Sequence, residues 1–179
     1  MNQLIIAKAV KKDLPIILDI LRKAFLEVAR TFNLKSMPQI EQTLESLTVE
    51  FSHYTFLKAT LIETDHSRSL DSGLCTLKGT SRNDINEVVV GSVRAYNKND
   101  TCYISRLVVL PEYQDRGIGK ALMKEIEKQF KNIVKRYELF TGSRDQRNQY
   151  LYNQLGYKSF KTEKHRDQIA FVFMEKSAQ

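Results

Sequence analysis

The sequence predicts an α/β protein with a mixed, mainly antiparallel twisted sheet of six to seven strands and flanking helices. Two observations favour this fold class. Short β-prone runs alternate with segments in which apolar residues recur every three to four positions. A strand, a helix and another strand also follow one another over residues 104–141, and a crossover of that length implies one parallel pair. At 179 residues, we expect a single domain over 1–179.

The N-terminal part is expected to supply one strand and two helices. Leu4-Ile5-Ile6 is a short β-prone run. Asp13 is expected to cap the first helix, which Pro15 suits at its first turn and whose apolar periodicity continues to Val28. A second helix is expected over roughly 39–50. Two consecutive helices would form a wall beside the sheet.

The middle of the chain is expected to be mostly β-structure. Weak alternation predicts a strand at 54–63, and residues 64–86 are too polar for a core and predict a long connection, with a small hairpin arm at 74–77. Residues 87–96 form a strand pattern, and a turn separates it from the run at 101–110. These last two strands are therefore expected to pair as a hairpin.

The C-terminal part is expected to alternate helices and strands. Apolar residues from Ile118 to Val134 mark one helix face, and 137–141 is the next strand. Another helix is expected over about 147–155, followed by a final hairpin of 157–162 and 169–175. The order of elements is consistent with the mixed sheet.

Composition and charge exclude several classes of protein. The formal net charge is +7: residues 1–100 carry 13 Lys and Arg against 12 Asp and Glu, and residues 101–179 carry 15 against 9. No apolar run approaches the roughly 20 residues of a membrane span, and no signal peptide is recognisable, so a cytoplasmic location without a membrane partner is expected. Cys75 and Cys102 lack metal-ligand spacing; reduced thiols are expected, and a disulfide between them stays open.

A turn with two glycines follows the strand expected at 101–110. Gly117 and Gly119 lie where the next helix begins, and such a turn attracts anions through its free main-chain amides and the helix dipole. Arg116 and Lys120 would add cationic donors. We therefore expect this turn to hold the pyrophosphate of a nucleotide-containing cofactor.

Two familiar phosphate loops fit this turn poorly. A Walker A loop requires a different glycine spacing and a hydroxyl directly after Lys120, where Ala121 stands. A dinucleotide-binding loop requires a third glycine where Leu122 stands. Glu138 does lie at a suitable distance for a ribose contact, so this weaker alternative stays open.

A third pattern fits better. Gln114-x-x-Gly117-x-Gly119, after a strand and before a helix, resembles the acetyl-CoA signature of the GNAT superfamily of N-acetyltransferases. Further stretches that resemble the family are residues 6–17, the run Leu107-Val108-Val109 followed by Pro111, and Asn148-Gln149-Tyr150-Leu151-Tyr152-Asn153-Gln154-Leu155-Gly156-Tyr157. The resemblance covers residues 87–175 closely. It implies the GNAT-like form of the sheet, with the parallel pair splayed around the cofactor.

The resemblance implies an acetyl-CoA site along the strand and the glycine turn. The residues expected to bind acetyl-CoA are Leu107, Val108, Val109, Gln114, Asp115, Arg116, Gly117, Ile118, Gly119, Lys120 and Asn148. The amides of 115–120 would converge on the pyrophosphate. If the strands part, the main-chain groups of Leu107 and Val109 could pair with the peptide-like arm of CoA. Asn148 could contact that arm or the next strand, or it could be a local cap.

The resemblance also implies catalysis by direct attack of an amine on the thioester. Tyr152 matches the tyrosine of the family that acts as general acid, whereas Tyr150 and Tyr157 are expected to pack in the core. No general base can be assigned. The candidates are Glu27, Glu41, Glu87, Tyr103 and a water held by Ser105, each also explained as a surface or packing residue. Asp145 stands where many members carry asparagine.

The implied function is an N-acetyltransferase that uses acetyl-CoA without a metal, with a primary amine of a small molecule or protein as acceptor. No pattern identifies that amine, and the resemblance leaves room for a homodimer. His53 and His165 are isolated in the sequence. The first alternative is a non-catalytic module that binds acetyl-CoA. The second is a basic nucleic-acid binder, which ranks low because no nucleic-acid-binding signature is present.

Overall fold

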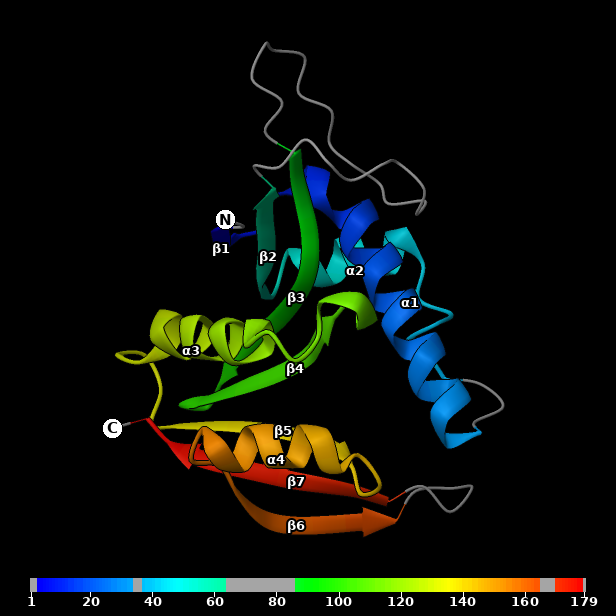
Figure 1. Cartoon of the computed structure of the whole chain (residues 1–179). Coiled ribbons are helices and arrows are strands. Elements are labelled where there is room, and N and C mark those ends of the chain that lie inside the picture. Colours follow the sequence, from blue (N-terminus) through cyan, green and yellow to red (C-terminus); the bar gives the residue numbers. More distant parts are fainter. Residues whose placement is uncertain (1–2, 34–36, 64–85, 165–169, 179) are drawn as a thin grey trace.

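The computed structural model describes residues 3–33, 37–63, 86–164 and 170–178. Seven strands form one sheet in the order β1-β2-β3-β4-β5-β7-β6 (Figure 1). The strands are β1 (Gln3–Lys8), β2 (Thr55–Glu63), β3 (Asn86–Lys98), β4 (Thr101–Val109), β5 (Arg136–Gly142), β6 (Lys158–Lys164) and β7 (Ala170–Ser177). The helices are α1 (Leu14–Phe32), α2 (Leu44–Phe51), α3 (Ile118–Phe130) and α4 (Gln146–Gln154). The predicted fold class is confirmed. The connection expected at 64–86 lies outside the described residues, apart from its last residue, which begins β3.

The sheet is antiparallel except between its fourth and fifth strands. β4 and β5 run parallel and pair through only three residue pairs, Thr101↔Arg136, Cys102↔Tyr137 and Tyr103↔Glu138. Beyond Tyr103 the two strands diverge, which leaves a gap between the two halves of the sheet (Figure 1). The splayed parallel pair therefore exists as the resemblance implied.

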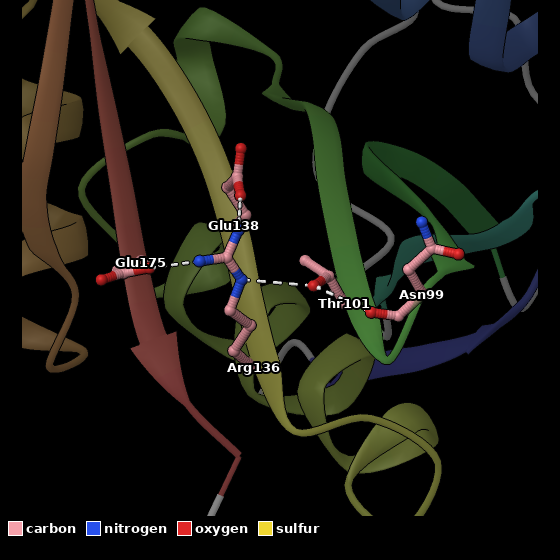
Figure 2. Close-up of polar contacts among 5 residues, drawn as sticks. All are labelled: Asn99, Thr101, Arg136, Glu138 and Glu175. Carbon is pink, nitrogen blue, oxygen red and sulfur yellow. Dashed lines mark hydrogen bonds and ion pairs between the residues drawn. The ribbon is translucent and has the colours of Figure 1, made fainter.

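Arg136 fastens the sheet at the closed end of this parallel pair (Figure 2). Its Nε donates to Thr101 Oγ1 of β4 at 3.2 Å, and its Nη1 donates to Glu175 Oε2 of β7 at 2.7 Å. Its Nη2 contacts Glu138 on its own strand. One guanidinium thus joins three strands, and its planar set of donors suits several acceptors at once.

A β-bulge lies in β4 just beyond the last parallel pair. Arg94 of β3 pairs with Ser105, and Ser92 pairs with Val108, so β4 contains one extra residue in this interval. Arg106 occupies the bulge and has a left-handed φ of 53°. An extra residue reverses the alternation of side chains along a strand. The alternation of side chains between the two faces of the sheet therefore reverses at Arg106.

Two hydrophobic clusters occupy opposite faces of the sheet, because neighbouring residues of one strand divide between them. Val88 and Val90 belong to the cluster formed with α3 and α4, whereas Val89 belongs to the cluster formed with α1 and α2. In β4, Ile104 lies in the first cluster and Val108 in the second, as the bulge requires. Within the described residues, no helix has the length and apolar character to cross a membrane.

Two local expectations differ from the structure, and the free thiol expected at Cys102 is present. The second helix begins at Leu44 rather than near residue 39, because Thr43 caps it by accepting a hydrogen bond from the Ser46 amide at 3.2 Å. Ile133 is 56% exposed, because the helix that carries the apolar face ends at Phe130. Cys102 is a fully buried free thiol, whose pKa burial raises to about 12. Cys75 lies outside the described residues.

Asp13 precedes α1 as expected, but its side chain does not cap that helix. The fully buried carboxylate accepts a hydrogen bond from the Val10 amide at 2.8 Å and pairs with Lys58 Nζ of β2 at 2.8 Å. It therefore stabilises the turn before the helix and fastens this turn to the sheet. A charge in the interior needs such partners to offset its desolvation.

Glu127 of α3 connects the helix to the C-terminal half of the sheet. Its Oε1 accepts a hydrogen bond from Tyr157 Oη at 2.9 Å, and its Oε2 accepts one from Lys176 Nζ of β7 at 2.6 Å. Its main-chain carbonyl accepts a hydrogen bond from Tyr137 Oη of β5 at 2.8 Å. Burial and the neighbouring Glu127 raise the pKa of Tyr157, so this phenol remains a donor.

We predict that Glu127→Ala lowers the free energy of unfolding by about 3 kcal/mol, because it leaves a buried phenol and an ammonium group without their acceptor. Glu125→Ala on the same helix is the matched control. Among the residues that the structure describes, its carboxylate contacts Gln129 and Lys128 of that helix, so its loss should cost about 0.5 kcal/mol. Chemical denaturation measures both. Equal effects of the two substitutions would contradict the connecting role of Glu127.

Candidate functional site

The glycine turn between β4 and α3 has the backbone geometry of an anion site. Asp115 and Gly117 both adopt left-handed conformations, with φ of 58° and 78°. Gly117 is the residue directly before α3, and a Cβ placed on it would meet nothing within 4 Å. The main chain of this turn is therefore open to an approaching ligand, and its curvature is typical of anion-binding turns.

The main-chain amides of residues 115–120 have no hydrogen-bond acceptor in the described parts of the chain. The next amide along the chain, that of Ala121, donates a hydrogen bond to the Gly117 carbonyl at 3.0 Å. Arg116 points back along its own turn, since its Nη2 donates to the Glu112 carbonyl at 2.9 Å. Lys120 is exposed on the first turn of the helix. Free amides and a helix N-terminus together favour a negatively charged group here.

Gln114 holds this turn in place, as the sequence predicted. Its Nε2 donates to the Val109 carbonyl at the end of β4, at 2.9 Å. Its Oε1 accepts a hydrogen bond from Arg147 of α4. Arg147 also pairs with Asp115, with 2.7 Å between Nη2 and Oδ1. The turn is thus fastened to both the strand before it and the helix across the gap.

The edge of β4 that faces the gap carries main-chain groups without strand partners. The Leu110 amide donates to the Val90 carbonyl at 2.9 Å, so Leu110 and Val108 direct their main-chain groups toward β3. By alternation, Leu107 and Val109 direct theirs toward the gap. Val109 uses its carbonyl to accept from Gln114. Of the three strand residues expected to bind the cofactor, Val108 thus has its main chain engaged with β3.

Tyr152 lies on α4 and is buried, with 6% of its surface exposed. Its ring centroid is 6.0 Å from that of Tyr157. Within the described residues, its hydroxyl has no hydrogen-bond partner. Burial, and to a lesser extent the charge of Asp145, raise the pKa of Tyr152. The hydroxyl is therefore protonated at neutral pH and retains a proton to donate.

Asn148 has a local role in the structure. Asp145 caps α4: its Oδ1 accepts a hydrogen bond from the Asn148 amide at 3.0 Å, and its Oδ2 accepts one from Asn148 Nδ2 at 2.6 Å. This corresponds to the cap among the interpretations that the sequence left open. A contact between Asn148 and a cofactor stays a prediction.

The other residues singled out in the sequence differ in their exposure and in their position relative to the gap. Tyr157 is buried as expected, whereas the expectation for Tyr150 is wrong, because its side chain is 68% exposed on the outer face of α4. Tyr103 and Ser105 lie on β4 at the start of the gap. The exposed residues on the outside are Glu27, Glu41, Glu87 and His53, whereas His165 lies outside the described residues. In the part of the chain that the structure describes, no group of three or more His, Cys, Asp or Glu side chains could hold a metal ion.

Three functional features were missed by the sequence interpretation. Arg147 connects α4 to the glycine turn, Glu127 connects α3 to β7, and Arg94 with Arg106 forms a charged cluster on the opposite face. A charged residue on a helix or strand has no local pattern that distinguishes such a role from a solvated surface position. Only the tertiary structure brings each one to its partners.

The arrangement of elements resembles that of several solved acetyltransferases. The structure of PaiA N-acetyltransferase from Thermoplasma acidophilum in complex with coenzyme A aligns with a TM-score of 0.70 at 20% identity, over 98% of this chain and 99% of that chain. The ribosomal-protein-S18-alanine N-acetyltransferase from Escherichia coli aligns with a TM-score of 0.68 at 15% identity, over 100% and 95%. A phosphinothricin acetyltransferase from Sinorhizobium meliloti in complex with AcCoA aligns with a TM-score of 0.67 at 18% identity, over 97% and 88%.

The comparison of the sequence with family models agrees with this likeness of fold. No curated protein matches the sequence. The family model described as Acetyltransferase (GNAT) domain, however, matches residues 82–178, just over half of the 179 residues. This range contains the splayed pair of strands, the glycine turn and Tyr152. The chain therefore belongs to the GNAT family of acetyltransferases.

Proposed function

We propose that this protein is an N-acetyltransferase that transfers the acetyl group of acetyl-CoA to a primary amine, with Tyr152 as general acid. The observation that carries the proposal is two groups of main-chain atoms without partners in the described residues. One is the edge of β4 at Leu107, and the other is the amides of residues 115–120. Such groups need partners when a ligand buries them.

These two groups suit the two parts of acetyl-CoA. The pantetheine arm contains amide groups, which can pair with a strand edge as another strand would. The pyrophosphate is an anion, which suits the free amides of the turn and the N-terminus of α3. Leu151, the neighbour of Tyr152, packs here too, since a Cβ on Gly119 would lie 3.5 Å from its Cδ2. The helix that carries Tyr152 thus borders the proposed cofactor site.

Acetyl-CoA supplies the acetyl group as a thioester when bound. The amine nitrogen forms the new C–N bond, the C–S bond breaks, and the nitrogen loses a proton to solvent or to a base. Tyr152 donates its hydroxyl proton to the leaving sulfur and regains a proton from solvent. Burial raises the pKa of Tyr152, so the phenol is protonated at neutral pH and has a proton to donate.

The neighbouring structures support the choice of cosubstrate and of chemistry. Two of them are complexes with coenzyme A or AcCoA, and another is named as an alanine N-acetyltransferase. A cytoplasmic location and a homodimer remain parts of this proposal. Phe140 and Phe160, 48% and 46% exposed on the C-terminal half of the sheet, are the apolar surface that a second copy could cover.

We predict that Tyr152→Phe lowers kcat by about 100-fold or more and changes the dissociation constant of acetyl-CoA by less than about twofold. The substitution removes the proton donor and retains the ring. Tyr150→Phe on the exposed face of the same helix is the control and should retain full activity. Thiol release measures turnover, and calorimetry measures binding. Undiminished kcat in Tyr152→Phe would contradict the assignment, and binding without thiol release from any amine would favour the non-catalytic module.

The pH dependence of turnover provides a separate prediction. Because burial raises the pKa of Tyr152 above the value of about 10 for free tyrosine, its proton should be retained throughout pH 7–9.5. Activity should therefore rise or stay level across this interval, since deprotonation of the amine can only help attack. Thiol release at saturating substrate measures the profile. A decline between pH 7 and 9 that disappears in Tyr152→Phe would show that the pKa is low instead.

A further inference from the structure

Two arginines lie on the face of the sheet opposite α3, at the edge of the gap. Arg94 of β3 and Arg106 of β4 both project toward α1 and α2, because their guanidinium groups lie over aromatic rings of that face. Glu50 of α2 is the carboxylate between these elements and the sheet. We call Arg94, Arg106 and Glu50 the arginine cluster. It is separate from the glycine turn and from Tyr152.

Arg94 is the fully enclosed member of the cluster. Its side chain is 5% exposed, and its Nη1 lies 2.5 Å from Glu50 Oε2. Its guanidinium carbon is 5.5 Å from the centre of the Phe56 ring and 5.9 Å from that of Tyr54. Burial lowers the pKa of Arg94 to about 10, although Glu50 opposes this effect. Arg94 and Glu50 thus form an ion pair in which the guanidinium is buried and the carboxylate is partly exposed. Gln42 Nε2 donates to the other oxygen of Glu50 at 3.0 Å.

Arg106 is the member of the cluster without an acceptor. Its Nε, like that of Arg94, is buried and has no hydrogen-bond partner in the described parts of the chain, and unlike Arg94 it has no ion pair there. The centre of the Phe25 ring of α1 is 5.9 Å from its guanidinium carbon. Burial lowers the pKa of Arg106, and the nearby charge of Glu50 opposes this effect. A half-buried guanidinium without a hydrogen-bond acceptor lowers the stability of the fold, unless a ligand provides that acceptor.

We propose that Arg106 binds a carboxylate on the acceptor, so that the acceptor is a small amine that also carries an acid group, such as an amino acid. This inference rests on the proposed function, because it identifies the class of its acceptor. Two guanidinium groups and one carboxylate leave a net charge of +1 in the cluster. A single carboxylate neutralises that charge, and its two oxygens match the paired donors of a guanidinium.

The position of Arg106 suits this role. It directly precedes Leu107, whose main chain faces the gap where the acetyl group is expected. An amine that enters from the face of α1 and α2 would therefore meet Arg106 within a few bonds of the reacting nitrogen. Tyr96 and Tyr103 stack beside the cluster, with ring centroids 5.2 Å apart, and Tyr54 contacts Tyr96 at 4.7 Å.

The test compares amino acids with their own amides, in which a neutral amide replaces the carboxylate. We expect the wild-type protein to acetylate the preferred amino acid with a kcat/KM at least 10-fold above that of its amide, as measured by thiol release. In Arg106→Gln this ratio should fall about 10-fold or more, and Arg106→Lys should restore part of it. Arg30→Gln, an equal loss of charge on the exposed end of α1, should leave the ratio unchanged.

Two further measurements separate this inference from the proposed function. Calorimetry with acetyl-CoA alone tests the proposed function, and a failure to bind would contradict that function. Titration of the protein with N-acetylated amino acids and their amides, with and without coenzyme A, tests the arginine cluster without turnover. Equal kcat/KM for acids and amides, an unchanged ratio in Arg106→Gln, or the absence of binding by the N-acetylated acids would overturn the inference. Tight binding of the acids that Arg106→Gln weakens would support it even without turnover.

Discussion

The divergence of β4 from β5 after three residue pairs is the constraint on which the rest of the structure depends. A parallel pair that continued along both strands would satisfy the main-chain groups of Leu107 and close the gap. Arg136 keeps the two strands together at their start, through Thr101 on one side and Glu175 on the other. Because pairing is firm at one end and absent at the other, the sheet stays continuous while it presents an open edge.

The two faces of this gap have different chemistry. On the face of α3 and α4, the open edge of β4 continues into the free amides of the glycine turn, and α4 brings Tyr152. Glu127 and Arg147 hold these helices to the sheet and to the turn. On the face of α1 and α2 there are aromatic rings and the arginine cluster. A cosubstrate on one face and an acceptor on the other would meet at the gap.

Much of the fold was predictable because its signals are local. Apolar periodicity located the strands and helices, and the crossover length predicted the parallel pair. Gln114 and the two glycines indicated the turn, and the structure shows Gln114 holding it as expected. The start of α2 was misplaced because Thr43 is one of several residues in that segment able to cap a helix. The exposure of Tyr150 was also missed, because the helical phase of a short polar helix is poorly determined by its sequence.

The site was only half predictable, since the proposed acceptor side depends on pairs of residues far apart in the chain. Arg94 and Glu50 are neighbours only because β3 and α2 pack together. Nothing in the local sequence marks Arg106 as a bulge residue, since arginine has no preference for a left-handed φ. Simple alternation would have placed Ile104 and Val108 on one face, whereas they belong to different clusters.

That bulge connects the two sides of the site. One extra residue turns the main-chain groups of Leu107 toward the gap and its side chain toward α3. The same residue directs the Arg106 side chain to the opposite face, over Phe25. The strand edge proposed for the cofactor arm and the guanidinium proposed for the acceptor are consequently adjacent in the chain. Their separation is set by backbone geometry rather than by flexible side chains. In the proposed reaction, a single irregularity in β4 would therefore align the two substrates.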